Sequence, residues 1–283
     1  LDKVYDALPT SQQVMLWQSL SRRLGAMNRP FLTWAAQKHM APEIQSEVLR
    51  AESRFEASPD TVARLSEAWG NPEIPWGERR AIAEQLIKSL GPEKWFDEFP
   101  PDLENNFEAQ VYRLGKGLQY QLRDRVKERL LGMRMPEQPE RARTAVEFIE
   151  LHVAAGLYEE GKALCRRMLV GSPTVRRAAD RSQAVKEQYG PYEPRAAIDL
   201  LWNKARGIGS QEIWLNLINF LLIHEEYPQA ATAVRHFPGT QQQVDEKKEV
   251  TLYRARIAEA TDKPQEALSA LVQLIYLELP PGS

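Results

Sequence analysis

The sequence predicts an all-α fold of repeated helical pairs, and two observations lead to this fold class. Alternating β-branched runs bounded by Asn-Gly or Asp-Gly are missing, whereas apolar residues recur at helical spacing from end to end. Proline and glycine interrupt this pattern and leave helix-sized segments of about 12 to 16 residues. We expect about sixteen helices in eight pairs, beginning near residues 10, 43, 76, 102, 139, 174, 211 and 245. A recurrence of about 34 residues is typical of a helical solenoid.

Composition narrows the functional class. The 283 residues are 43% hydrophobic, which is enough for a sizeable core, and the net charge of -2 favours neither nucleic acid nor a membrane surface. No run of about 18 apolar residues is present, so we expect no membrane span. The chain begins with Leu and shows no signal-peptide pattern, so we expect a fragment of a longer protein. Cys165 is the single cysteine, which excludes an internal disulfide and a cysteine-based zinc site.

The repeat pattern is clearest in the segment IWLNLINFLLIHEEYPQAATAV, residues 213–234. It places five residues in a characteristic order: Trp214, Leu217, Leu221, Tyr227 and Ala230. This segment resembles the tetratricopeptide repeat, whose consensus has an aromatic at position 4, Leu at 7, Tyr at 17 and Ala at 20. The resemblance implies a right-handed α/α superhelix of about eight helical pairs. In such a pair the small residue at position 20 lets the second helix approach closely, and the aromatic at 17 fills the turn.

Neighbouring segments repeat the spacing. Tyr158, Tyr192 and Tyr227 follow one another at nearly equal intervals of one repeat length, and small residues follow at Gly161, Ala196, Ala230 and Ala267. Pro264 stands where the last aromatic belongs, and Ile149 and Ile218 occupy positions that are usually small in the family. We therefore expect clear repeats over residues 136–283, continuous with degenerate ones over residues 1–135.

A second resemblance concerns Glu52. The stretch LRAESRFEASPD, residues 49–60, resembles the start of the catalytic motif of soluble lytic transglycosylases, in which a glutamate protonates a glycosidic oxygen. The Gly-rich, Gly-Leu-Met-Gln and Tyr-Asn-Ala-Gly segments of that family do not occur. A general acid also needs apolar surroundings that raise its pKa, whereas Glu52 lies among Arg50, Arg54 and Glu56. We expect a solvated helix residue.

Other catalytic or metal patterns are missing. His39, His152, His224 and His236 have no metal-binding spacing and are expected at helix ends and turns. Gly207-Ile208-Gly209 follows an apolar helix without a lysine, so it predicts a helix-ending turn and no phosphate site. Two sets of tryptophans are expected in the core or in turns: Trp202 and Trp214 on repeat stripes, and Trp69, Trp76 and Trp95 beside Pro-rich turns. We expect no cofactor, no metal and no enzymatic activity.

Charge and register predict a partner surface. Residues 113–186 hold 16 basic and 9 acidic residues, or +7, and the remainder holds 21 and 30, or -9. In the resembling family the first helix of each pair lines a concave groove through positions 2, 5, 9 and 12. The matching residues here are Arg143, Val146, Glu150, Val153, Arg177, Asp180, Ala184, Glu187, Glu212, Leu215, Asn219, Leu222, Glu249, Leu252, Arg256 and Glu259.

Four of these residues predict an apolar floor, namely Val146, Leu215, Leu222 and Leu252, and three flank it, namely Arg143, Arg177 and Arg256. Such a groove suits a protein segment that carries some acidic residues. The predicted binding set is Arg143, Val146, Glu150, Arg177, Asp180, Leu215, Asn219, Leu222, Leu252 and Arg256.

The leading functional hypothesis is a non-catalytic scaffold that binds a protein partner. Its expected setting is a bacterial envelope assembly such as an exopolysaccharide export machine that docks a partner enzyme, in the periplasm, with the cytoplasm as the alternative. A second hypothesis, the helical superhelix domain of a larger peptidoglycan-cleaving enzyme, stays open, because such enzymes also carry helical superhelices.

Overall fold

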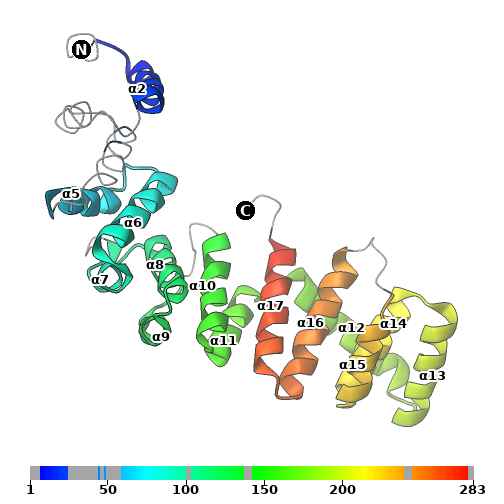
Figure 1. The fold of residues 1–283 in the computed structure, drawn as a ribbon. Coiled ribbons are helices and arrows are strands. Elements are labelled where there is room, and N and C mark those ends of the chain that lie inside the picture. Colours follow the sequence, from blue (N-terminus) through cyan, green and yellow to red (C-terminus); the bar gives the residue numbers. More distant parts are fainter. Residues whose placement is uncertain are drawn as a thin grey trace. The chain divides into compact units, whose positions relative to one another are not determined.

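The protein is helical throughout the part that a computed structural model describes, which is residues 7–24, 44, 48, 59–99, 103–136, 142–238 and 244–279. These residues contain fourteen helices and no strand, which confirms the all-α prediction (Figure 1). Contacts divide the chain into two compact units, residues 1–122 and residues 123–283.

The helices begin close to the expected positions. The first unit contains α2 (Thr10–Leu24), α5 (Pro59–Gly70), α6 (Trp76–Leu90), α7 (Pro92–Asp97) and α8 (Phe107–Gln119). The second contains α9 (Arg123–Gly132), α10 (Ala142–Ala155), α11 (Tyr158–Met168), α12 (Pro173–Tyr189), α13 (Pro194–Ile208), α14 (Gln211–Ile223), α15 (Tyr227–His236), α16 (Val244–Ala260) and α17 (Pro264–Glu278). Seven of the eight expected starts fall within five residues of a helix start, and the one near residue 43 lies outside the described residues.

Local sequence explains these boundaries. Proline at the first helical position has a suitable φ and lacks only an N–H that would be unpaired there, and Pro173 begins α12 in this way. Ser172 precedes it, and its hydroxyl accepts a hydrogen bond from the backbone N–H of Val175. Gly209 ends α13 with a φ of 67°, so Gly207-Ile208-Gly209 is the helix-ending turn that the sequence predicted.

Two buried arginines hold the helices of the first unit together. Arg79 of α6 donates from Nε to the carbonyl oxygen of Trp69 in the last turn of α5, at 2.9 Å, and lies over the Trp69 ring. Arg113 of α8 does the same for α7, since its Nε lies 2.8 Å from the carbonyl oxygen of Phe96 and its guanidinium lies over that ring. Carbonyls in the last turn of a helix lack intrahelical partners, and the negative end of the helix dipole also stabilises a cation there. The two arginines are separated in the sequence by the same interval as Tyr158 and Tyr192.

The tryptophans of the first unit form its core. Trp69 and Trp95 are buried and Trp76 is half-buried, with the Trp69 ring centroid 5.6 Å from that of Trp76 and 6.4 Å from that of Trp95. Tyr112 packs against the same rings. The core or turn position expected for these three tryptophans is confirmed.

The second unit does not stack its helices in chain order. Helix α17 packs on α10, α11 and α16, and α16 packs on α12, α14 and α15 (Figure 1). The last pair therefore stands between α10–α11 and the α12–α15 group. In a regular solenoid each repeat contacts only its neighbours along the chain. The packing of this unit departs from that order, because α17 of the last pair packs against the early pair α10–α11.

Gly161 explains how α17 fits against α11. A Cβ atom at Gly161 would lie 2.6 Å from Cδ2 of Leu268 and 3.2 Å from Cβ of His152. The absence of a side chain thus allows α11 to approach both α10 and α17. Two hydrogen bonds join the same region to α17, from the Tyr276 hydroxyl to Glu150 at 3.0 Å and from the Ser172 hydroxyl to Glu278 at 2.7 Å.

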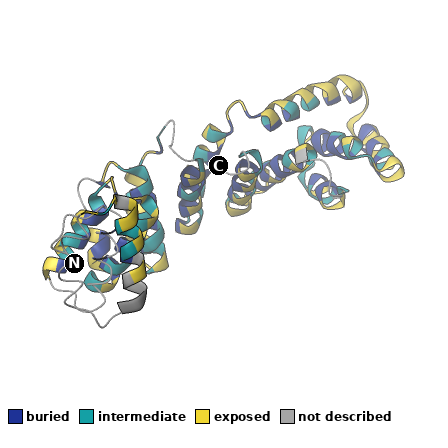
Figure 2. Cartoon of the chain, turned by 90° about the horizontal axis from the view of Figure 1, so that it is seen from above, coloured by how far each residue is buried: buried dark blue, intermediate teal, exposed yellow. Residues whose placement is uncertain are grey.

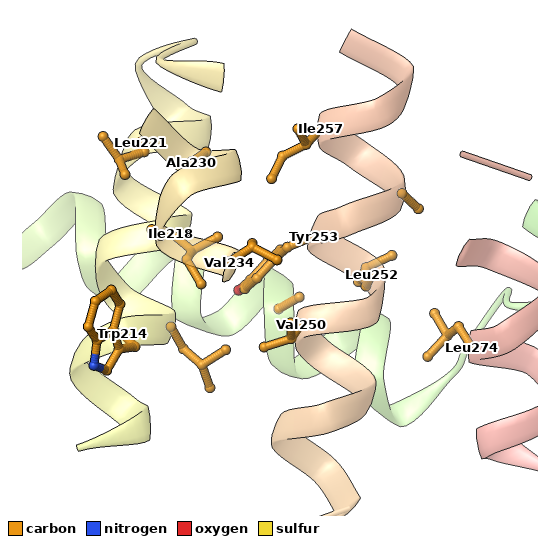
Figure 3. Close-up of a cluster of buried hydrophobic side chains, with 14 of the residues drawn as sticks. Trp214, Ile218, Leu221, Ala230, Val234, Val250, Leu252, Tyr253, Ile257 and Leu274 are labelled. Carbon is orange, nitrogen blue, oxygen red and sulfur yellow. The ribbon is translucent and has the colours of Figure 1, made fainter. Parts of the chain in front are cut away.

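The apolar core of the second unit lies between its helices. Figure 2 shows buried residues along the helices, and α14 is buried on most of its circumference, from Trp214 to Leu221. Trp214 and Ile218 of α14 pack with Val234 of α15 and with Tyr253 of α16 (Figure 3). Trp214 is buried, and Trp202 is half-buried beside it with ring centroids 5.7 Å apart. Both therefore take the packing role that the sequence predicted.

We expect Gly161→Ala to lower the free energy of unfolding by about 1–3 kcal/mol, because the new methyl group overpacks the contact with Leu268. Gly207→Ala is the matched control, since a Cβ there meets no atom within 4 Å and alanine favours the helix by about 0.5–1 kcal/mol. Urea unfolding measures both effects, and hydrogen exchange of α17 amides locates the first. Equal effects of the two substitutions would contradict the packing described.

We expect Arg113→Met to destabilise the first unit by about 2–4 kcal/mol, because it leaves the buried carbonyl of Phe96 without its donor. Lys88→Met on α6 removes one positive charge from an exposed position and should change stability by no more than about 0.5 kcal/mol. Denaturant unfolding followed by tryptophan fluorescence compares the two. A similar, small effect of both variants would show that the buried arginine does not hold α7 and α8 together.

Candidate functional site

A buried polar network joins α12, α14 and α16. The Arg181 guanidinium of α12 binds both carboxylate oxygens of Glu249 on α16, with Nε 2.6 Å from Oε1 and Nη2 3.4 Å from Oε2. Its Nη1 donates to the Asn216 side-chain oxygen of α14 at 2.8 Å. The Tyr253 hydroxyl donates to the same Glu249 carboxylate at 2.6 Å. One carboxylate therefore collects donors from two helices.

Asn219 of α14 completes the network. Its Nδ2 donates to the Tyr253 hydroxyl at 2.9 Å and to the Ser182 hydroxyl at 3.0 Å. Ser182 in turn donates to Oδ1 of Asn219 at 3.1 Å. Since these hydrogen bonds cross between all three helices, they fix the helices in one relative arrangement.

The electrostatics of the network favour the charged ion pair. Burial opposes the Arg181 cation, but the hydrogen bonds and negative charge of Glu249 outweigh it and raise the pKa of Arg181 above its usual value. Burial and the charge of Glu249 raise the pKa of Tyr253, so its hydroxyl stays protonated and remains a donor. Glu249 is only 2% exposed, so its carboxylate is shielded from solvent, whereas Arg181, Ser182 and Asn216 at the edge of the network are half-buried.

The apolar residues of the predicted groove lie in the core. Val146 and Leu215 are fully buried, and Leu252 is 6% exposed and lies on the side of α16 that faces Leu274 of α17 (Figure 3). Leu222 is half-buried and packs against the same core. These side chains fill the space between helices and do not form an open floor.

The polar residues of the predicted groove are dispersed. Asn219 is buried in the network, whereas Arg143, Glu150 and Asp180 are exposed. Arg143 pairs with Glu147 at 3.2 Å, Arg177 pairs with Asp245 at 2.8 Å, and Glu150 accepts the hydroxyl of Tyr276. Arg256 is half-buried with its guanidinium carbon 5.9 Å from the centroid of the Tyr253 ring. Because α10 packs on α17 while α12, α14 and α16 enclose the network, the predicted groove residues do not meet on one surface.

The other candidates are structural where they are described. His152 is buried, and burial lowers its pKa below the usual value, which its contacts with the Phe148 carbonyl and Glu160 only partly oppose. His224 and His236 are exposed at the ends of α14 and α15, so the expected positions at helix ends are confirmed for these three. Burial raises the pKa of Cys165 to about 12, as expected for a cysteine on a buried stripe. Glu52 and His39 lie outside the described residues.

The described residues contain neither a metal-binding cluster nor a helix that could span a membrane. They contain no cluster of three or more His, Cys, Asp or Glu side chains that would suit a metal ion. None of the described helices is both long enough and apolar enough to cross a membrane.

An open groove of about 900 Å³ runs along α16 between α15 and α17. Each of the three helices contributes one stripe with the spacing of a single helix face. The lining residues are Tyr227, Pro228, Ala231, Thr232, Val234 and Arg235 from α15, Arg254, Ile257, Ala258 and Thr261 from α16 and its end, and Lys263, Gln265, Glu266, Ser269, Ala270 and Gln273 from α17 and its cap. We call this surface the α16 groove.

The α16 groove has an apolar floor and a basic rim. Ile257 and Ala258, which are 8% and 5% exposed, lie at the base of the groove, and the half-buried Ala231 and Ala270 lie beside them with small side chains. Arg235 and Arg254 are exposed on the rim. This surface was not predicted from the sequence, because the predicted groove was built from first helices only. A spacing of i, i+3, i+4 and i+7 in Arg254, Ile257, Ala258 and Thr261 was the available signal.

No protein-family model, curated protein or solved structure matches this chain.

We expect Glu249→Gln to destabilise the second unit by about 2 kcal/mol or more, because it leaves the Arg181 cation without its counter-charge. The Arg177–Asp245 pair also joins α12 to α16 but is exposed, so Asp245→Asn should cost no more than about 1 kcal/mol. Urea unfolding of the two variants tests the difference. The double variant Arg181→Met, Glu249→Met should be more stable than Glu249→Gln, because it removes both charges. If it is not, the unpaired charge of Arg181 is not the cause of the destabilisation.

Proposed function

We propose that this protein is a non-catalytic scaffold that docks another protein on its second unit. The helical pairs α10–α11, α14–α15 and α16–α17 are interpreted as repeats of the tetratricopeptide kind. Their packing order differs from the chain order because α16–α17 packs between α10–α11 and the α12–α15 group. The α16 groove is the docking surface. The expected envelope setting, the periplasmic location and the alternative of a cell-wall enzyme's helical domain stay predictions.

The observation that carries this proposal is the composition of the α16 groove. It combines an apolar floor that includes Ile257 and Ala258 with a polar rim of Arg235, Arg254, Gln265 and Gln273. Protein interfaces show this arrangement, in which an apolar centre is desolvated while a polar rim fixes orientation. The predicted first-helix residues do not combine these features, because they do not meet on one surface.

The rigidity of α16 supports the same conclusion. Glu249 and Tyr253 of this helix bind α12 and α14 through the buried polar network. A binding surface held in place before the partner arrives loses less conformational entropy on binding. The network therefore serves the groove by fixing the helix that forms its floor.

We predict that a photoreactive amino acid placed at Gln273 or Gln265, on the exposed rim of the groove, will form a covalent adduct with a second protein in cells that make the full chain. Gln188 is the matched control position, since it is exposed on α12 and lies outside the groove. Gel mobility and mass spectrometry identify the adduct.

A second variant separates docking from chance contact. Ser269 is an exposed groove residue, and Ser269→Trp fills the groove with a large ring while leaving the buried core unchanged. It should abolish the adduct formed from Gln273. Adducts of equal yield from Gln188 and Gln273, or none from either rim position, would argue against docking at this surface.

A further inference from the structure

We infer that the α16 groove takes a short amphipathic α-helix of a partner protein, with an acidic side chain against Arg235 and Arg254. This inference rests on the proposed docking function and adds to it the conformation and the charge of the docked segment. Three features of the groove lead to it: its backbone chemistry, its length and its charge distribution.

The backbone chemistry of the groove favours a helix over an extended segment. An extended peptide must find partners for its backbone N–H and C=O groups when it is buried. The groove is built from three α-helices whose interior backbone groups bond within their own helix, and its floor of Ala231, Ile257, Ala258 and Ala270 is apolar. An occupant that satisfies its own backbone hydrogen bonds can cover such a floor, and a helix is that occupant.

The dimensions suit a short helix. The lining positions of α17 run from Gln265 to Gln273, eight residues apart, which at 1.5 Å per residue is about 12 Å. That length accommodates somewhat more than two helical turns. Alanines at Ala231, Ala258 and Ala270 let another helix approach closely, so that larger apolar side chains of the partner fill the spaces between them.

The charges of the groove are placed unevenly. Figure 3 shows that Val234 of α15 lies level with Tyr253 of α16, whereas Ala230 lies level with Ile257. Arg235 and Arg254 follow Val234 and Tyr253 in sequence, so both arginines lie at the same end of the groove. At α17's N-terminal end, by contrast, Lys263 is neutralised by Glu266 at 3.2 Å.

The two arginines are available to a partner. Arg254 is exposed and makes no ion pair with any residue in the described part of the chain, and Arg235 donates only to the Thr232 hydroxyl there, at 3.1 Å. Two exposed guanidinium groups beside an apolar floor favour a carboxylate, which can accept two hydrogen bonds from one arginine. An acidic residue in the terminal turn of the docked helix meets this requirement.

The test selects binders from a displayed library of random linear peptides of about 16 residues, with the full chain as the target. We expect enriched peptides to share apolar residues at i, i+3 or i+4 and i+7, together with Asp or Glu in a terminal turn. Ser269→Trp should abolish their binding, and proline at the central position of the peptide should do the same because it breaks a helix.

Charge reversal provides the decisive comparison. Arg235→Glu, Arg254→Glu should weaken binding of the selected peptide by about tenfold or more, and a peptide with Lys in place of its acid should recover binding to this variant. Arg176→Glu, Arg195→Glu makes the same change of net charge at exposed positions outside the groove and should leave the affinity unchanged.

The remaining outcomes distinguish the inference from the proposed function. Peptides that Ser269→Trp displaces, but that bind without an acid or tolerate the central proline, would overturn the inference and leave docking at the groove intact. Self-association of the chain that Ser269→Trp abolishes would overturn it by making a second copy the occupant. If no selected peptide depends on the groove, both the inference and the proposed docking surface fall.

Discussion

Glu249 imposes the constraint on which the second unit depends. A carboxylate that is 2% exposed is costly to keep charged unless it has a counter-charge and hydrogen-bond donors, and Arg181 and Tyr253 supply them. Arg181 belongs to α12, so α16 must lie beside α12. Asn219 then ties Tyr253 to α14, which leaves these three helices one satisfactory arrangement. The position of α17 follows, since it is joined to α16 by a short turn and must cover α16, α10 and α11 together.

Local features of this fold were accessible from the sequence. The helix starts and the turn at Gly209 follow from proline, glycine and apolar spacing, all of which act within a few residues. The burial of the predicted groove residues was not accessible from the sequence, for a different reason. Leu215, Asn219 and Leu252 do stand on first helices, as the register required, but periodicity cannot tell a surface groove from a contact between helices. The polar character of Asn219 and Glu249 looked like solvent exposure, although each is buried with partners on other helices.

Two further features show where sequence reasoning stops. Gly161 was expected to bring the two helices of one pair together, and a Cβ there would indeed crowd His152 of α10, but it would lie even closer to Leu268, on a helix at the other end of the second unit's sequence. No local pattern reports such a contact. Arg79 and Arg113, in contrast, recur at the repeat interval and were visible in the sequence. They were overlooked because an isolated arginine usually indicates a solvated face, whereas here each one binds a helix-terminal carbonyl and covers an aromatic ring.

The two faces of α16 connect stability to binding. The residues that fix the helix, Glu249 and Tyr253, lie toward α12 and α14, and the residues of the open stripe, Arg254, Ile257 and Ala258, line the groove. Neighbouring positions such as Tyr253 and Arg254 thus serve different faces, because successive residues of a helix point about 100° apart. Since the network holds the helix by charge-assisted hydrogen bonds, a change at an exposed groove position such as Arg254 or Thr261 leaves the packing of the unit intact. These exposed positions are therefore free to vary with the partner, whereas Glu249, Arg181 and Tyr253 must be kept together or replaced together.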